Sequence, residues 1–253
     1  MKNILSVPAA VLFLLIATNL QALDIPALNQ LLPSDARFEE DRARDPIRKP
    51  AEVLNFLGLE PGMTVMDYIA ADGYYTAVLS LAVGPAGKVY SHNSTGNMEF
   101  DTTLAGRDMK VRQAVQVRSE RLPYANVEPW EHGTIDLQMA PDSLDFVITA
   151  LNFHDIYNMD PARAETALRG LWTILKPGGI LGIIDHAGDA GRDNNTLHRA
   201  TLQSVLDTAT ASGFVVEATS DLLHNAADDH SLAVFDPSLG RNTDRFIVRL
   251  RKP

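Results

Sequence analysis

From residue 50 onward, apolar residues occur alternately in short continuous runs and in longer stretches with helical spacing. Short apolar runs are typical of strands buried on both faces, whereas apolar positions three and four residues apart indicate helices. The pattern predicts strands at 64–68, 88–91, 127–130, 146–151, 180–184, 214–219 and 246–250. It predicts helices at 27–32, 50–59, 75–82, 103–120, 161–175 and 197–211. This alternation predicts the α/β fold class with a mostly parallel sheet.

Turn and cap residues mark the ends of several elements. Asp160 before Pro161 predicts the N-cap and first turn of the helix at 161–175. Pro177-Gly178 predicts a turn after that helix, because proline presets one backbone dihedral and glycine accepts a positive one. A polar loop is expected at 187–197.

The residues between the strand at 64–68 and the following helix have the form of a ligand-binding loop. Asp67 lies near the strand end, and residues 69–73 are mostly small. A strand, a tight loop and a helix form half of a βαβ unit, whose loop binds nucleotide-like ligands beside a helix N-terminus. Ile69 is tolerated there only if its dihedrals are ordinary and its side chain points into the core, because glycine normally allows the close approach.

Several segments of the chain have counterparts in one family. Asp67 and Gly73 occupy the first and last fixed positions of the motif hydrophobic-hydrophobic-Asp-x-Gly-x-Gly-x-Gly. Ile69 and Ala71 stand where that motif has its first two glycines. The other segments are RKPAEVLNFLGLEPGMTVMD, LNFHDIYN, LKPGGILGIIDH, HRATLQSVL and TDRFIVRLRKP. On the basis of these segments, residues 47–253 resemble class I S-adenosylmethionine-dependent methyltransferases. Within that superfamily, they most resemble a group of predicted methyltransferases with an export signal.

The resemblance implies a Rossmann-like fold with a seven-stranded, mostly parallel sheet and an antiparallel last strand. It also implies S-adenosylmethionine as the cofactor. At the end of the second strand, Asn93 stands where the family carries an acid that accepts hydrogen bonds from the ribose. An amide accepts such a bond without charge-assisted strength. The predicted cofactor-binding residues are Asp67, Ala71, Asp72, Gly73, Asn93 and Asn152.

Methyl transfer from a sulfonium is a direct displacement that needs an acceptor placed in line and sometimes the removal of its proton. Loops at the carboxyl edge of a parallel sheet converge, and three of them carry polar groups here. The predicted catalytic residues are His154, Asp155, Asp185 and His186. His154 is the candidate base. Adjacent residues seldom pair in the required way, so Asp185 or a more distant acid is the expected partner.

Other interpretations of these residues stay open. Asp185 and His186 could equally form a structural strand end. Imidazole and carboxylate also suit Zn, Fe or Mn, but the sequence holds no metal motif with tight spacing, and no metal site is predicted. The alternative function is an exported ligand-binding protein that keeps the fold without the cofactor, because S-adenosylmethionine is made in the cytosol.

The composition of the chain limits the classes of molecule that it is expected to bind. The 253 residues are 45% hydrophobic and 21% charged, which suits a chain with a normal core. The net charge of −10 disfavours nucleic acid, and the basic cluster of Arg42, Arg44, Arg48 and Lys49 reads as a solvated surface segment. No cysteine is present, which excludes disulfides and thiolate chemistry. A small-molecule substrate is therefore predicted, without an indication of oligomeric state.

The amino terminus has the pattern of a secretory signal. Lys2 precedes an apolar region at 4–17, and Ala22 is a small residue before a cleavage point. The apolar region is shorter than the roughly 20 residues of a spanning helix, although an uncleaved anchor remains an alternative. The sequence thus predicts a signal peptide at 1–22, an N-terminal arm at 23–46 and a methyltransferase-like domain at 47–253. The cleaved product would be periplasmic or secreted, without stable membrane insertion.

Overall fold

A computed structural model describes residues 22–253 of the chain. The predicted signal peptide at 1–22 lies outside the described residues except for its last one. Among the described helices, none is both long enough and apolar enough to cross a membrane.

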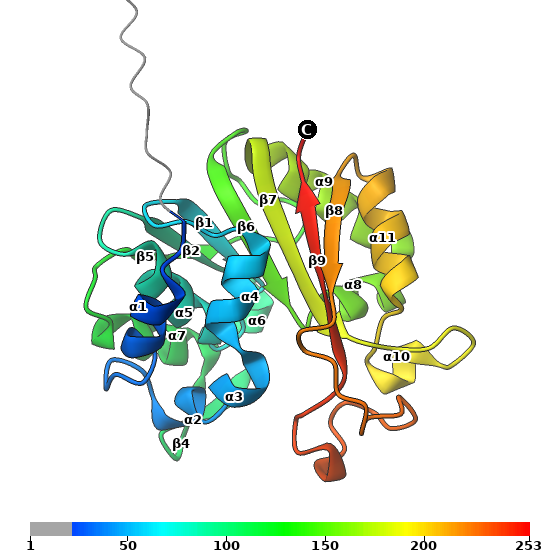
Figure 1. Cartoon of the computed structure of the whole chain (residues 1–253), viewed down its shortest axis with the longest axis horizontal. Coiled ribbons are helices and arrows are strands. Elements are labelled where there is room, and N and C mark those ends of the chain that lie inside the picture. The colour runs from blue at the N-terminus through cyan, green and yellow to red at the C-terminus, as the bar shows by residue number, and fades with distance from the viewer. Residues whose placement is uncertain (1–21) are drawn as a thin grey trace, which may run out of the picture.

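A seven-stranded sheet forms the centre of the molecule, in the order β5-β2-β1-β6-β7-β9-β8 (Figure 1). In chain order the strands are β1 (Thr64–Tyr68), β2 (Lys88–Asn93), β5 (Val127–Glu131), β6 (Leu144–Ala150), β7 (Leu175–His186), β8 (Val215–Ser220) and β9 (Arg245–Arg251). The pairs from β5 to β7 are parallel, and β9 is antiparallel to both of its neighbours. The predicted fold class, mostly parallel sheet and antiparallel last strand are therefore confirmed.

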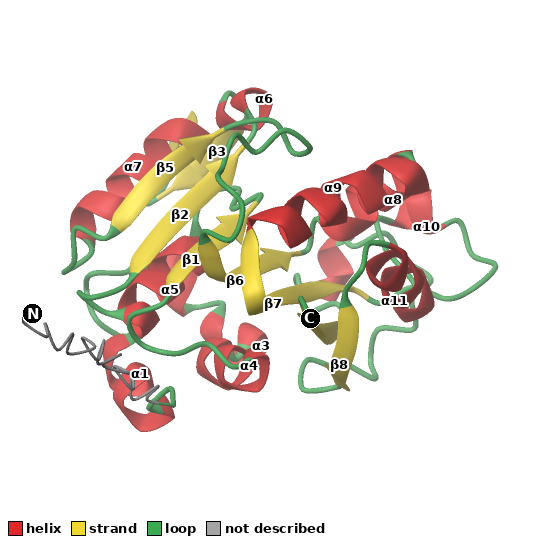
Figure 2. Ribbon diagram, turned by 90° about the horizontal axis from the view of Figure 1, so that it is seen from above, coloured by secondary structure: helices red, strands yellow, loops and turns green. Residues whose placement is uncertain are grey.

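Helices cover both faces of the sheet (Figure 2). They are α1 (Ile25–Leu31), α2 (Glu39–Arg42), α3 (Asp45–Arg48), α4 (Pro50–Leu57), α5 (Tyr74–Val83), α6 (Thr95–Met98), α7 (Val111–Arg121), α8 (Phe153–Met159), α9 (Pro161–Ile174), α10 (Asn194–Leu197) and α11 (Leu202–Ala211). A 3₁₀ turn, η1, spans Pro237–Leu239.

Two apolar layers hold these helices to the sheet. Val65 packs with α4 and α5 on one face, while its neighbour Met66 packs with α9 on the other. Phe146 and Val147 divide between the faces in the same way. Successive strand residues point to opposite faces, so a strand buried on both sides must be apolar at every position. This is why the central strands were readable as continuous apolar runs.

The predicted helix at 103–120 is wrong in its first part. Residues there form a hairpin of β3 (Asp101–Leu104) and β4 (Arg107–Lys110), and α7 begins only afterwards. The turn residues Ala105 and Gly106 both have positive φ, at 54° and 67°. Two-residue hairpin turns require this conformation, and it interrupts a helix.

Three other boundaries differ from the sequence predictions. The strand predicted at 180–184 begins at Leu175, and the Pro177-Gly178 turn is an irregularity inside β7, where Leu144 pairs with Leu175 but Phe146 pairs with Ile180. The polar loop at 187–197 contains α10, and the helix predicted from 197 starts at Leu202. The short helix α8 was not predicted at all.

Candidate functional site

Three cavities adjoin one another along the carboxyl edge of the sheet. The loop cavity has a volume of about 180 Å³ and is lined by Asp67 and residues 69–72. The arginine cavity has a volume of about 730 Å³ and is lined by Arg48 and Arg245. The outer cavity has a volume of about 550 Å³ and is lined by Asp155. The loop and arginine cavities share Arg44, Arg48 and Leu151. The loop and outer cavities share Ile69, Ala71 and Asn152. The shared lining places the three along one cleft.

The loop between β1 and α5 keeps a backbone typical of glycines, although Ile69 and Ala71 stand where the motif has its first two glycines. Ile69 and Ala71 have φ of 57° and 49°, and Gly73 has φ of 95°. For a side chain branched at Cβ this conformation is an outlier, and each left-handed residue costs roughly 1–2 kcal/mol. The expectation of ordinary dihedrals at Ile69 is thus wrong. Its side chain does lie in the core, packed in the layer that contains Met66 and Phe153.

Hydrogen bonds from neighbouring strands fix this strained loop. Asn93 at the end of β2 accepts from the Ala71 N–H and donates to the Ala71 carbonyl, each at 3.0 Å. Asn152 donates to the Ile69 carbonyl at 3.0 Å, and the Ala70 N–H donates to the His92 carbonyl at 2.8 Å. Strained backbone persists where its surroundings over-determine it. The contact between Asn93 and the ribose of the cofactor remains a prediction. In the structure, the Asn93 amide is bonded to the loop.

Asp67 is a buried acid on the wall of the loop cavity. Its carboxylate accepts a hydrogen bond of 2.7 Å from the Thr76 hydroxyl, which also contacts Ser91 at 2.9 Å. Burial raises the pKa of Asp67 to about 7, although the Thr76 hydrogen bond opposes this. A carboxylate in such a place is stabilised by a cation brought against it, because burial penalises the uncompensated charge.

Asp72 is tied to a helix far along the chain. The Arg118 guanidinium donates to the Asp72 carbonyl at 2.7 Å and to its carboxylate at 3.2 Å. The same guanidinium makes two bonds to the buried Asp41, at 2.9 and 3.0 Å. Arg118 therefore joins the N-terminal arm, α7 and the loop, a connection that the sequence did not reveal.

The predicted catalytic residues lie together around His154. Asp185 accepts from the His154 N–H and contacts its Nδ1, both at 2.7 Å, as the sequence led us to expect. In addition, His154 Nε2 lies 3.2 Å from Asp155 Oδ1, an adjacent-residue contact that was not predicted. Burial alone would lower the pKa of His154, but the carboxylates of Asp185 and Asp155 outweigh it and raise that pKa to about 10. A ring that holds both protons at neutral pH is poorly suited to act as a base.

His186 lies on the wall of the arginine cavity, with its ring centroid 5.6 Å from that of His154. Its Nδ1 is 2.6 Å from the Thr243 hydroxyl. Burial and the charge of Arg245 lower the pKa of His186 well below its usual range. The two histidines therefore differ in protonation, one positive and one neutral.

The arginine cavity was missed by the sequence interpretation. Arg48 is half-buried with its guanidinium 4.3 Å from the Tyr74 ring centre, so it does not belong to a solvated surface segment. Within residues 22–253, no carboxylate oxygen lies within 4 Å of the guanidinium nitrogens of Arg48 or Arg245. Burial, reinforced by the charge of Arg48, lowers the pKa of the buried Arg245 to about 10. Two arginines without acidic partners on a cavity wall favour an anionic ligand.

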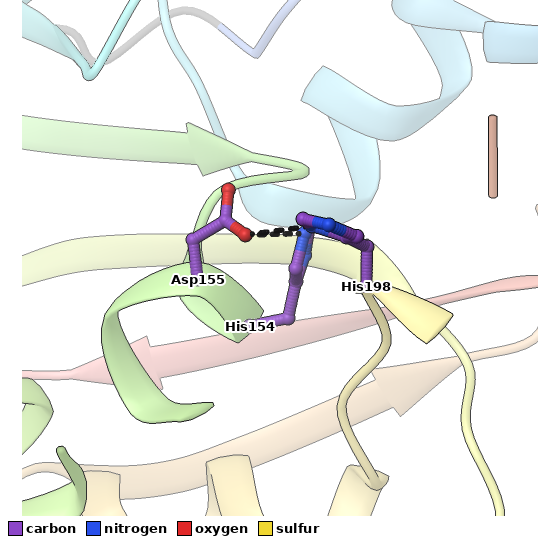
Figure 3. Close-up of side chains that lie close together, drawn as sticks. All are labelled: His154, Asp155 and His198. Atoms are coloured by element: carbon purple, nitrogen blue, oxygen red, sulfur yellow. Dashed lines mark hydrogen bonds and ion pairs between the residues drawn. The ribbon is translucent and has the colours of Figure 1, made fainter. Parts of the chain in front are cut away.

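His198 was also missed as a site residue. It follows α10, and its Nδ1 lies 3.0 Å from Asp155 Oδ1. Figure 3 shows His154, Asp155 and His198 pointing toward one another. The segment HRATLQSVL contributed only to the resemblance, and no local pattern connects His198 to residues 43 positions earlier.

Comparisons with known proteins identify the fold. No family model and no curated protein sequence matches the chain. Among solved structures, a SAM-dependent methyltransferase from Aquifex aeolicus is similar at 19% identity and a TM-score of 0.62, covering 91% of this chain and 99% of that one. The [4+2]-cyclase SpnF is similar at 18% identity and a TM-score of 0.60, covering 87% and 85%. A possible exported protein from Bordetella parapertussis is similar at 14% identity and 0.56, covering 92% and 80%.

The sheet order and these similarities define the chain as a protein with the Rossmann-like fold of class I methyltransferases, as the sequence predicted. Its structural neighbours include SAM-dependent methyltransferases and a cyclase. Because one fold supports different reactions, the function has to be argued from the cleft itself.

Proposed function

We propose that this protein transfers a methyl group from S-adenosylmethionine to a small anionic molecule held in the arginine cavity. One observation carries the proposal. The loop at 69–73 keeps the left-handed backbone that glycines normally supply, although Ile69 and Ala71 make that conformation strained. A loop shape that is maintained against strain, and braced by Asn93 and Asn152, supports a retained ligand-binding role.

The residues of the cleft fit the cofactor in charge and space. When bound, S-adenosylmethionine supplies a methyl group on a cationic sulfonium. The buried carboxylate of Asp67 offers the compensating negative charge on the loop-cavity wall. The adjoining outer cavity adds about 550 Å³ for the rest of the molecule. We infer that Asp67, Ala71, Asp72, Gly73, Asn93 and Asn152 form the cofactor site.

The acceptor is proposed to lie in the arginine cavity, which adjoins the loop cavity through Arg44, Arg48 and Leu151. A carboxylate or phosphate on the acceptor would pair with Arg48 and Arg245, whose guanidinium groups have no acidic partner among the described residues. This contact would position the acceptor for in-line displacement. His186 lines this cavity and is our candidate proton acceptor, with His154, Asp155 and Asp185 as the group behind it.

Calorimetry with S-adenosylmethionine and S-adenosylhomocysteine tests the cofactor assignment on the chain that starts at Leu23. Ala71→Gly is expected to leave the affinity unchanged or increase it, because glycine relieves the left-handed strain. It should also raise the free energy of unfolding by about 1 kcal/mol.

Ala70→Gly is the matched control for that loop variant. Ala70 lies outside the left-handed region, and glycine there should destabilise the protein by about 0.5–1 kcal/mol. If the parent shows no binding at millimolar cofactor and Ala71→Gly does not restore it, the methyltransferase assignment is abandoned. That result would leave the alternative of a binding protein without the cofactor.

We also propose that the protein is exported to the periplasm or secreted. Lys2, the apolar region and Ala22 support this, and Leu23, the residue after the predicted cleavage point, is buried. In a Gram-negative host, the extracytoplasmic product is expected to begin near Leu23, as measured by N-terminal sequencing and intact mass. A cytosolic product that retains Met1 would contradict export.

A further inference from the structure

Three side chains at the end of the cleft have the arrangement of metal ligands. His154 Nε2 lies 3.2 Å from Asp155 Oδ1, and His198 Nδ1 lies 3.0 Å from the same oxygen. All three ligand atoms lie within 4.8 Å of one another. A tetrahedral ion with bonds of about 2.0–2.1 Å separates neighbouring ligand atoms by about 3.3 Å. Two of the separations are already close to this value.

A carboxylate behind His154 fixes the direction of its ring. Asp185 is fully buried, and its two oxygens contact the His154 N–H and Nδ1, both at 2.7 Å. With Nδ1 engaged there, Nε2 is the nitrogen directed at Asp155, and an ion that binds at Nε2 would displace the proton held there. A metal-bound histidine usually donates its second ring N–H to a carboxylate or carbonyl in this way.

The helix that carries two of these side chains also positions the third. Asn158 on α8 donates to the carbonyls of Asn194 and Arg199, at 3.1 and 3.0 Å, and these carbonyls flank His198 in the chain. Arg199 is fully buried and paired with Asp228 at 2.9 Å. The three side chains are therefore held near one another before any ligand arrives, which lowers the ordering entropy that binding must overcome.

We propose that His154, Asp155 and His198 bind one divalent transition-metal ion of the class Zn²⁺, Fe²⁺ or Mn²⁺. Two imidazoles and one carboxylate are the donor set that these ions share. The side chains of Asp155 and His198 are 57% and 40% exposed, and Asp155 lines the outer cavity, so the ion keeps positions open to water or a small ligand. The sequence singled out His154 and Asp155 as site residues, but no local pattern connects them to His198, which is 43 residues from Asp155.

Metal titration of the tag-free, chelator-dialysed protein without cofactor tests the proposal. Zn²⁺ is followed by calorimetry and Co²⁺ by its visible absorption. We expect one ion per chain and the absorption bands of four- or five-coordinate cobalt.

His198→Asn and Asp155→Asn should each weaken Zn²⁺ binding by about tenfold or more, and Asp185→Asn by about 10–100-fold through loss of the supporting bond. Asparagine suits position 198 because it tolerates the left-handed φ of 53° found there. His132→Asn is the control, since His132 lies outside the cluster, with its ring tilted against that of Trp130. It should leave binding unchanged.

The proposal is overturned if Zn²⁺ does not bind, or if binding in folded His198→Asn and Asp155→Asn equals that of the parent. The three side chains would then form a hydrogen-bonded cluster only. Circular dichroism establishes that each variant is folded, and these two exposed positions decide the outcome if Asp185→Asn does not fold. Because the titration contains no cofactor, its outcome does not depend on whether the methyltransferase proposal is correct.

Discussion

Replacing Arg118 by Met is expected to lower the free energy of unfolding by about 3–5 kcal/mol. The Arg118 guanidinium is buried and makes two hydrogen bonds to Asp41, which is itself fully buried. Without Arg118, that carboxylate keeps only Arg44 as an ion-pair partner. Urea unfolding at neutral pH measures the change, and limited proteolysis should show earlier cleavage in the arm at 23–46.

The expected loss depends on pH in a defined direction. Burial opposes ionisation of Asp41, but Arg118 and Arg44 outweigh it and hold the pKa of Asp41 below its ordinary value of 3.8. A folded pKa below the unfolded one contributes stability that disappears as pH falls through it. The difference between parent and Arg118→Met should therefore shrink in acid.

An exposed ion pair provides the control for Arg118. Arg169 is 58% exposed and contacts Glu165 at 2.6 Å, so Arg169→Met should change stability by no more than about 0.5 kcal/mol. A loss below about 1 kcal/mol for Arg118→Met would show that the docking of the arm does not rest on this buried pair.

Asp67→Asn is expected to stabilise the protein, by on the order of 2–4 kcal/mol near pH 8. Burial raises the pKa of Asp67 to about 7 in the folded chain. A raised folded pKa means that stability is full below the unfolded pKa and is lost as pH rises through the folded one. Asparagine stays neutral, so its advantage should be large near pH 8 and small near pH 5, as measured by urea unfolding at both.

The same variant is expected to bind S-adenosylmethionine more weakly, by ~2 kcal/mol or more, because it lacks the carboxylate that we propose faces the cation. Asp35, with a side chain 97% exposed, is the control position, where Asn should change neither property. A stability difference that does not vary with pH would contradict the buried, proton-holding state of Asp67.

The central strands of the sheet could be predicted because burial is nearly continuous along them. Val65, Met66, Phe146 and Val147 are all buried, so the strands were visible without knowledge of their partners. The hairpin at 101–110 and the left-handed Ile69 were not, because their conformations depend on turn geometry and on bonds from other strands. Local propensity carries no information about such long-range bonds.

The candidate site likewise contains residues that could be predicted from the sequence and residues that could not. His154 follows the end of β6, while Asp185 and His186 end the adjacent β7, and parallel topology alone brings such ends together. Arg48 comes from α3 before the sheet, Arg245 from the last strand, and His198 from a loop. Their meeting depends on packing across the whole chain, for which no spacing rule exists.

The position of Arg44 and Arg48 links ligand binding in the cleft to the docking of the arm. Both residues lie on or beside α3, near the junction of the arm and the domain, and both form a wall shared by two cavities. The arm packs Leu23, Leu28 and Leu32 into the main core beside α4 and α5, and the Arg118–Asp41 pair ties it to α7, so docking of the arm and folding of the sheet are coupled. A ligand that contacts Arg44 and Arg48 only when the arm is docked would therefore stabilise the arm as well as the cleft by mass action.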